Sequence, residues 1–253
     1  MDVIKTKTDN EKKGFDCKWN FSVDKIEKTI EKARVEGRHQ LLEDEARKVL
    51  EAAGIPIAKG GVVHDMESCL ETAEELGYPV VLKIVSEDII HKVDLGGVEV
   101  NLENEKEVID AYQAIHSRIK NRKPDAHIRG ISVAEMVEDH IEVVIGGVTD
   151  ATFGPVVMFG LGGIHVEVFE DVEFRIAPLS LDDAHSMMAD IDSFPLLTGS
   201  RERSCRDLNA LAETISRVGQ LMYEINEIKD IDLNPVAALE EGAKALDVAI
   251  SLK

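Results

Sequence analysis

Apolar residues recur every three or four positions in several stretches of the chain, and this spacing predicts amphipathic helices. The longest stretch, 206–225, has an apolar stripe that runs from Leu208 to Ile225. Asp65 is an expected N-cap, and Gly77 favours a helix end. The predicted helices cover 23–35, 39–53, Asp65 to Leu76, Glu103 or Asn104 through Ile119, 182–190 and 206–225.

Other apolar stretches predict strands. In the segment 80–85, VVLKIV, the apolar positions are continuous, which is typical of a sheet covered on both faces. The segments 128–137 and 140–150 follow each other closely, and we expect them to pair. The predicted strands cover 80–85, 98–102, 128–137, 140–150, 155–160, 228–236 and 243–252.

This mixed order of helices and strands predicts an α+β fold of two lobes. Residues 1–20 are polar and aperiodic, and we interpret them as a flexible tail whose end is attached by Trp19 and Phe21. The polar segment NRKPD, 121–125, marks a boundary between a first lobe, 21–127, and a second lobe, 128–253. A cleft between two lobes is a common place for a nucleotide.

Composition narrows the possible partners. The 253 residues carry a formal net charge of −20, from 49 acidic and 29 basic side chains, so nucleic acid and anionic membranes are poor partners. A phosphate site would therefore need local lysines, glycine N–H groups and a metal ion. The three cysteines are far apart, which fits neither a disulfide framework nor a zinc site. Without a membrane span or signal-peptide core in the sequence, we expect a cytoplasmic protein.

The stretch from Lys83 to Gly97 carries candidate phosphate chemistry. Lys83 ends an apolar strand, where an unpaired ammonium would be costly and a bound anion would remove the cost. Gly96 and Gly97 form a turn expected to offer free backbone N–H groups, and His91 lies between. The alternative is a solvated strand end, an ordinary hairpin turn and a loop histidine without a task.

A second candidate is a set of oxygen ligands near the C-terminus. Asp232 and Asn234 are two residues apart on a predicted strand, so they share one face. Asp247 interrupts the apolar strand that follows, and a carboxylate there needs a partner. Such ligands suit Mg²⁺, although polar residues of a hairpin would look the same.

Two further groups of residues suit other parts of a nucleotide. Glu135 and Val137 end a strand and would offer main-chain groups to an adenine edge, while Glu142 would accept hydrogen bonds from ribose hydroxyls. A strand–turn–strand with a surface glutamate is the alternative. Arg175 follows a glycine-rich turn and could clamp a phosphate. His165 alternates with valines as in a strand, so we interpret it as structural.

Taken in order, these segments resemble an ATP-grasp domain. The resemblance is strongest to the β subunit of ADP-forming acetate–CoA ligase, a member of the nucleoside-diphosphate-forming acyl-CoA synthetases. It rests on KIVSEDIIHKVDLGGVEVNL and IDLNP, with agreement also in GIPIAKGGVV and AEMVEDHIEVVIGGVTDATFGPVVMFGLGGI. It covers roughly residues 37–253. The motifs in this order are specific evidence for the family, whereas GIPI or DLNP alone would be weak evidence.

The resemblance implies a role for most of the candidate residues. ATP or ADP and Mg²⁺ are the implied cofactors. The implied roles are phosphate binding for Lys83, a phosphate-covering loop for Gly96 and Gly97, adenine contact for Glu135 and Val137, ribose contact for Glu142, Mg²⁺ ligation for Asn234 and Asp247, phosphate transfer for His91 and orientation of that histidine for Asp232. Arg175 rests on its chemistry more than on a family motif.

The implied protein is one half of an enzyme. The resemblance implies a CoA-binding α subunit as its partner, in an α2β2 heterotetramer, and this chain itself has no Rossmann-type glycine fingerprint. The implied reaction is acyl-CoA + ADP + phosphate ⇌ acid + ATP + CoA, with His91 carrying phosphate from an α-subunit histidine to Mg-ADP. Alternatives are a succinyl-CoA synthetase β chain, a non-catalytic ATP-grasp nucleotide-binding module, or a fragment of a fused synthetase. The acid used and the choice between ATP and GTP remain open.

Overall fold

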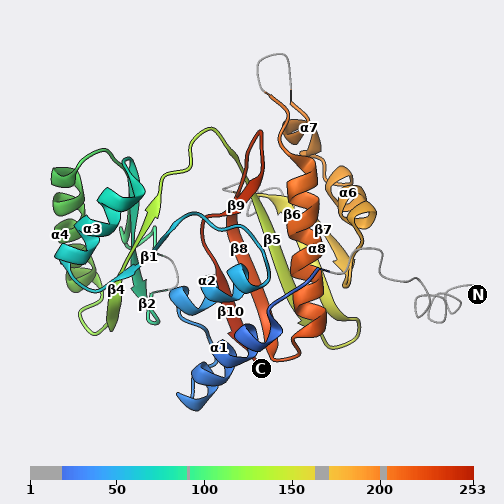
Figure 1. Cartoon of the computed structure of the whole chain (residues 1–253), viewed down its shortest axis with the longest axis horizontal. Helices are drawn as coiled ribbons and strands as arrows, with labels where there is room; N and C mark the ends of the chain where they lie inside the picture. Colours follow the sequence, from blue (N-terminus) through green and yellow to red (C-terminus); the bar gives the residue numbers. More distant parts are fainter. Residues whose placement is uncertain (1–18, 90–91, 163–170, 200–203) are drawn as a thin grey trace, which may run out of the picture.

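The structure, a computed structural model, describes residues 19–89, 92–162, 171–199 and 204–253 (Figure 1). Its helices are α1 (Val23–Val35), α2 (Glu43–Ala52), α3 (Met66–Leu76), α4 (Glu105–Arg122), α6 (Leu181–Ala189), α7 (Phe194–Leu197) and α8 (Leu208–Glu224). Its strands are β1 (Gly60–Val63), β2 (Val80–Ser86), β3 (Val98–Leu102), β4 (Ile128–Glu135), β5 (Ile141–Asp150), β6 (Gly154–Leu161), β7 (Val172–Ile176), β8 (Ile228–Ala238), β9 (Ala243–Ala245) and β10 (Ala249–Leu252).

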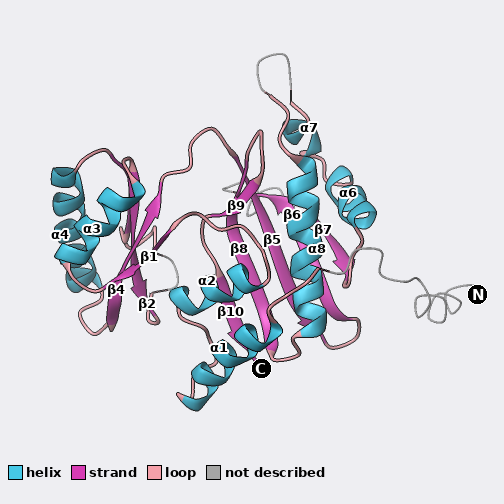
Figure 2. Ribbon diagram, viewed as in Figure 1, coloured by secondary structure: helices cyan, strands magenta, loops and turns pink. Residues whose placement is uncertain are grey.

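The described strands form two antiparallel sheets, which define two lobes. The first lobe is a sheet of order β1-β4-β2-β3 with α3 and α4 on its outer face, at the left of Figure 1. The second lobe is a larger sheet of order β10-β8-β5-β6-β7, in which β9 pairs with β8. Helix α8 lies across β5, β6 and β8, with α6 beside it (Figure 2).

Each lobe has its own core. In the first lobe, Leu82 and Ile84 of β2 are fully buried against α3 and α4. In the second lobe, the apolar stripe of α8 packs on Val157 and Phe159 of β6, and α1 and α2 contribute to this same core. The faces of the sheets that carry no helices are therefore left for the junction between the lobes.

The helices agree closely with the periodicity of the sequence. Helix α1 has the predicted bounds, Asp65 caps α3 by accepting a 2.8 Å hydrogen bond from the Ser68 N–H, and Asn104 caps α4. Helix α2 begins at Glu43 rather than at 39, because residues 39–41 pair with β10: the Leu41 N–H donates to the Ile250 carbonyl, and the Leu252 N–H donates to the His39 carbonyl. The short helix α7 was not predicted.

The pairing of strands differs from the expectation in two places. The predicted pair 128–137 and 140–150 is wrong, because β4 lies between β1 and β2 while β5 belongs to the other sheet. The sheets therefore divide after β4 rather than at residue 127, and α1 and α2 pack with the second lobe rather than with the first. The predicted strand 243–252 is divided into β9 and β10.

The end of the predicted tail is attached to the second lobe. The indole Nε1–H of Trp19 donates to Ser216 Oγ at 3.1 Å, and the Arg217 guanidinium lies 3.8 Å from the centre of the indole ring. Phe21 is buried in the core. The attachment by Trp19 and Phe21 is therefore confirmed, and residues 1–18 of the tail lie outside the described part of the chain.

A buried ion pair joins the connection after α1 to helix α2. The Glu45 carboxylate, 2 % exposed, accepts bonds of 2.7 and 2.8 Å from the Arg38 guanidinium and one of 3.0 Å from the Leu42 N–H. Burial alone would raise the pKa of Glu45, but these donors outweigh it and lower the pKa. The pair thus stabilises the fold only while Glu45 is ionised.

We therefore expect Glu45→Gln to destabilise the protein by about 2 kcal/mol at neutral pH. Because the folded pKa is lowered, the contribution is present above the unfolded value and is lost as the pH falls through the folded value. Urea unfolding of both proteins, at neutral pH and in acid, should show a smaller difference in acid, where Glu45 becomes protonated. If the difference in unfolding free energy between the parent and Glu45→Gln is the same at neutral pH and in acid, it does not come from the ionised Glu45.

Candidate functional site

Lys83 reaches from the first lobe to the second. Its neighbours Leu82 and Ile84 are buried under the helices of the first lobe, so strand alternation turns Lys83 to the other face of β2. Its ammonium donates a 2.6 Å hydrogen bond to the carbonyl of Leu246, in the connection between β9 and β10. A carbonyl is neutral, so the positive charge of Lys83 remains available to an anion at the junction of the lobes.

Asp247, the next residue along the chain, is held by a second lysine. The ammonium of Lys92 lies 3.3 Å from the Asp247 carboxylate and 3.2 Å from that of Glu43, at the start of α2. Burial would lower the pKa of Lys92, but the charges of Glu43 and Asp247 outweigh it and raise the pKa. Lys92 is therefore a firmly charged link between the two lobes.

Strand β8 brings two of the predicted ligands to one face. Asp232 and Asn234 are exposed while Ile231 and Leu233 are buried, which confirms that the two polar residues share a face. Although the Asp232 side chain has accessible surface, the surrounding protein partly desolvates it and raises its pKa, and the nearby charges of Asp247 and Asp230 raise the pKa further. Carboxylates crowded in this way favour the binding of a cation.

The predicted position of Asp247 needs a correction. It lies in the connection between β9 and β10, not inside a strand, because the Leu246 N–H turns back to bond the Pro235 carbonyl. Nowhere in the described ranges do three His, Cys, Asp or Glu side chains come together to hold a metal. The residues still fit Mg²⁺, which needs only one or two protein carboxylates when phosphate oxygens and water supply the rest.

The glycine turn differs from its predicted form. The N–H of Gly96 donates to the Val93 carbonyl at 2.9 Å, and the N–H of Gly97 donates to the Lys92 carbonyl at 2.8 Å. The expectation of free N–H groups is therefore wrong, because the turn closes on itself. A Cβ at Gly97 would lie 2.5 Å from Ile84 Cγ2, so glycine is required there by packing.

The segment between β4 and β5 lies beside an apolar cluster at the junction of the lobes. Val137 packs there, and its N–H makes no backbone hydrogen bond within the described part of the chain. The N–H of Glu135 is instead bonded to the Lys59 carbonyl at 2.9 Å. The cluster consists of Ala58, Val137, Ala237, Leu239 and Leu246.

The carboxylates of Glu135 and Glu142 have different surroundings. Glu135 accepts bonds from Lys244 Nζ at 2.8 Å and from the Lys59 N–H at 3.0 Å. Burial would raise its pKa, but these donors lower it, so Glu135 supports the junction as an anion. Glu142 is exposed on β5, and its carboxylate lies 3.9 Å from His140 Nε2. Glu142 thus remains open to a ligand.

Arg175 is not brought together with the other predicted residues. Arg175 on β7 is paired with Val157 on β6, and both lie on the face of the sheet that α8 covers. Asp232 is paired with Gly146 and lies on the opposite face of the sheet. The Arg175 guanidinium is bound to Glu173 at 2.8 Å and to Asp190. This placement does not suit the predicted phosphate clamp. His91 and His165 lie outside the described residues.

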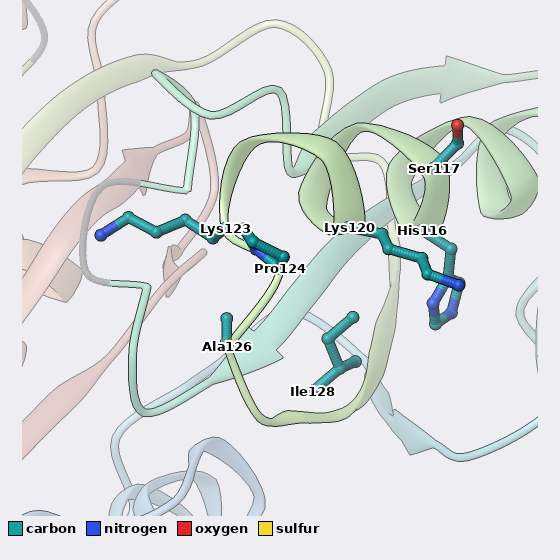
Figure 3. A pocket seen from close by; sticks show the side chains of 7 residues that line it. All are labelled: His116, Ser117, Lys120, Lys123, Pro124, Ala126 and Ile128. Atoms are coloured by element: carbon teal, nitrogen blue, oxygen red, sulfur yellow. The ribbon is translucent and has the colours of Figure 1, made fainter.

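A described pocket of about 490 Å³ lies elsewhere, where α4 ends and β4 begins (Figure 3). His116 and Lys123 line it and point in opposite directions, and no predicted site residue takes part. The buried Nε2 of His116 has no partner among the described residues, and burial lowers the pKa of this imidazole. The pocket is therefore lined by a neutral histidine and not by the residues predicted to bind nucleotide.

Sequence reasoning missed Glu43, Leu246 and the bridging role of Lys92. The carbonyl of Leu246 has no signature in sequence, and Glu43 looks like an ordinary acidic residue in the first turn of a helix. Lys92 could have been suspected, because it is the immediate neighbour of His91.

Comparison with known proteins decides the family. A family model described as an ATP-grasp domain matches residues 32–252. The β subunit of an ADP-forming acetate–CoA ligase from Pyrococcus furiosus is 44% identical over 230 residues, which cover 91% of this chain and 99% of that protein. The chain belongs to the ATP-grasp family of acid–CoA ligase β subunits. The predicted ATP-grasp fold and family are thereby confirmed.

Two other relatives place the chain within this ATP-grasp family. An ADP-forming 4-hydroxybutyrate–CoA ligase from Nitrosopumilus maritimus is 41% identical over 237 residues, 93% of this chain but 34% of that longer protein. A dinucleotide-forming acetyl-coenzyme A synthetase from Ca. Korarchaeum cryptofilum was solved with coenzyme A and Mg-AMPPCP, its phosphohistidine segment pointing towards the nucleotide-binding site. It matches with a TM-score of 0.79 and 41% identity over 90% of this chain and 100% of that chain.

No helix in the described part of the chain has both the length and the apolar character that crossing a membrane requires.

Proposed function

We propose that the chain is the nucleotide-handling β subunit of an ADP-forming acyl-CoA synthetase. The single observation that carries this proposal is the meeting of Lys83 with the connection that holds Leu246 and Asp247. The proposed phosphate-binding cation comes from the first lobe, and it bonds the residue next to the proposed metal-binding carboxylate of the second lobe. That arrangement suits the polyphosphate of a nucleotide bound between the lobes.

The other parts of the nucleotide have matching surroundings. The apolar cluster around Val137 would pack on the base, and the Val137 N–H, which makes no backbone hydrogen bond to any described residue, would be available to the edge of the base. Glu142 would accept hydrogen bonds from ribose hydroxyls. Asn234 and Asp247 would hold Mg²⁺, which neutralises phosphate charge when it is bound. Glu135 would act mainly by fixing the segment before Val137, because its own N–H is already bonded.

His91 would carry the phosphoryl group. A neutral imidazole nitrogen attacks the γ-phosphorus of ATP, the bond to the β-phosphate oxygen breaks, and ADP leaves. Lys83 would stabilise the negative charge during this transfer. Asp232, on the same face of β8 as Asn234, would orient the histidine.

The reverse transfer makes ATP and requires a phosphate donor. By analogy with the Pyrococcus furiosus β subunit, we assign that task to a CoA-binding α subunit, in an α2β2 assembly in the cytoplasm. The α subunit would form an acyl phosphate from acyl-CoA and phosphate with release of CoA, take the phosphoryl group onto its own histidine with release of the acid, and pass it to His91. The acyl specificity would then belong to the partner rather than to this chain.

A coupled assay tests the proposed reaction. The chain and the α-type protein that copurifies with it should together convert acetyl-CoA, ADP and phosphate into acetate, CoA and ATP. Neither protein alone should form ATP, because each lacks half of the relay. A chain that binds Mg-ATP but never accepts phosphate, alone or with its partner, would instead be a non-catalytic nucleotide-binding module.

A further inference from the structure

Lys92 connects the glycine turn to the opposite lobe. Its carbonyl accepts the Gly97 N–H and so closes the turn 92–97. Its ammonium extends away from the turn to Glu43 and Asp247. One residue therefore joins the turn of the first lobe to α2 and to the β9–β10 connection of the second.

The turn is also held within its own lobe by two arginines. Arg118 Nη1 donates to the Gly96 carbonyl at 2.6 Å, and Arg122 Nη1 donates to the Asp94 carbonyl at 2.9 Å. Both arginines belong to α4, so the turn is already fixed to its own lobe. The reach of Lys92 across the junction needs another explanation.

Charge supplies that explanation. Glu43 and Asp247 are 8% and 26% exposed, and their carboxylates repel each other unless a cation lies between them. The ammonium of Lys92 is the cation present. A divalent ion bound to Asp247 would supply the same compensation, and two cations on one carboxylate oppose each other.

We propose that Lys92 is a positioning residue that competes with the divalent cation for Asp247. Binding of the metal would release the turn 92–97 from the second lobe, and loss of the metal would let Lys92 attach it again. The inference rests on the proposed function, in which Asp247 is a metal ligand.

The competition has a consequence for phosphate transfer. Lys92 follows His91 directly in the chain, so release of Lys92 would act on the residue next to the proposed phosphate carrier. Loading of the metal and release of the residue beside the phosphate carrier would thus be coupled through one carboxylate. Glu43 would retain part of the hold on Lys92 after Asp247 has turned to the metal.

Binding of Mn²⁺ to the full chain without nucleotide tests the competition, with free Mn²⁺ measured by electron paramagnetic resonance. We expect Lys92→Gln to bind Mn²⁺ about tenfold more tightly than the parent protein, because the internal competitor is gone. Lys92→Arg should retain the parent affinity. Lys48→Gln is the matched control, because Lys48 is an exposed lysine on α2 paired with Asp44.

Hydrogen exchange gives a second readout that a merely structural ion pair would not move. Mn²⁺ should speed exchange of the amides in 92–97 of the parent chain, since metal binding detaches the turn. In Lys92→Gln this exchange should already be fast and should not respond to Mn²⁺.

The possible outcomes separate this inference from the proposed function. If Asp247→Asn loses Mn²⁺ affinity but Lys92→Gln does not gain it relative to Lys48→Gln, the competition is refuted and the metal site stands. If Asp247→Asn leaves the Mn²⁺ affinity unchanged, Asp247 is not a ligand, and the metal assignment of the proposed function fails together with the inference.

Discussion

The His91→Asn variant should accept phosphate from ATP at least about a thousandfold more slowly than the parent chain, because it lacks the attacking nitrogen. The measurement is transfer of label from γ-labelled ATP to the purified chain, without its partner, as acid-labile phosphate. Mg-ATP affinity should change little, since the asparagine removes a nucleophile rather than a phosphate ligand. His127→Asn, an exposed histidine in the connection before β4, is the matched control and should label normally.

A single result would overturn this assignment. If His91→Asn incorporates label at the parent rate while His165→Asn does not, the reactive imidazole is His165. The interpretation of His165 as structural would then be the error, and the carrier segment would lie in the second lobe.

Lys83→Met should weaken binding of Mg-ATP by about a hundredfold, which corresponds to about 2.7 kcal/mol. The methionine retains the length of the side chain but loses the charged hydrogen bonds to phosphate oxygens, each worth about 1.5–3 kcal/mol. Calorimetric titration measures the loss directly. Lys106→Met, an exposed lysine on α4, controls for the general loss of one positive charge.

The stability of the Lys83 variant must be measured beside its affinity. Removal of the bond from Lys83 to the Leu246 carbonyl should cost only about 1 kcal/mol, so the variant should remain folded at ordinary temperature. A folded variant with parent affinity for Mg-ATP would show that Lys83 only links the two lobes and binds no phosphate.

Strand alternation made part of the site predictable. The face shared by Asp232 and Asn234 follows from a period of two, because their neighbours Ile231 and Leu233 must be buried. Lys83 could be singled out because a cation in an apolar strand needs a partner, although it lies in the middle of β2 rather than at the predicted strand end. Helix α8 was equally predictable, since its apolar stripe matches one face of a helix packed on a sheet.

Features that depend on distant pairing could not be predicted in this way. Strands β4 and β5 are neighbours in sequence, yet the short connection between them passes from one sheet to the other. Local patterns cannot distinguish that connection from a hairpin. The same limit explains why the placement of Arg175 does not suit the expectation. The alternation of residues along its strand shows that the strand has two faces, but it does not show which face α8 covers.

Hydrogen bonds within a turn were a second source of error. The sequence shows that Gly96 and Gly97 permit a tight turn, but it does not show where their N–H groups point. In the structure both N–H groups are used inside the turn, and Lys92 makes the contact with the second lobe. Whether a glycine-rich loop offers its N–H groups to phosphate therefore depends on its closure, which the sequence leaves undetermined.

The central claim is that this chain carries phosphate reversibly between a nucleotide and its own histidine. Its most direct test is a pulse and chase on the purified chain. The chain is first labelled with γ-labelled ATP and Mg²⁺, then freed of nucleotide, and then given Mg-ADP. The predicted result is acid-labile label on the peptide that contains His91, returned to solution as labelled ATP within the chase. Label that stays on the chain, or that leaves only as free phosphate when ADP is added, would contradict the claim.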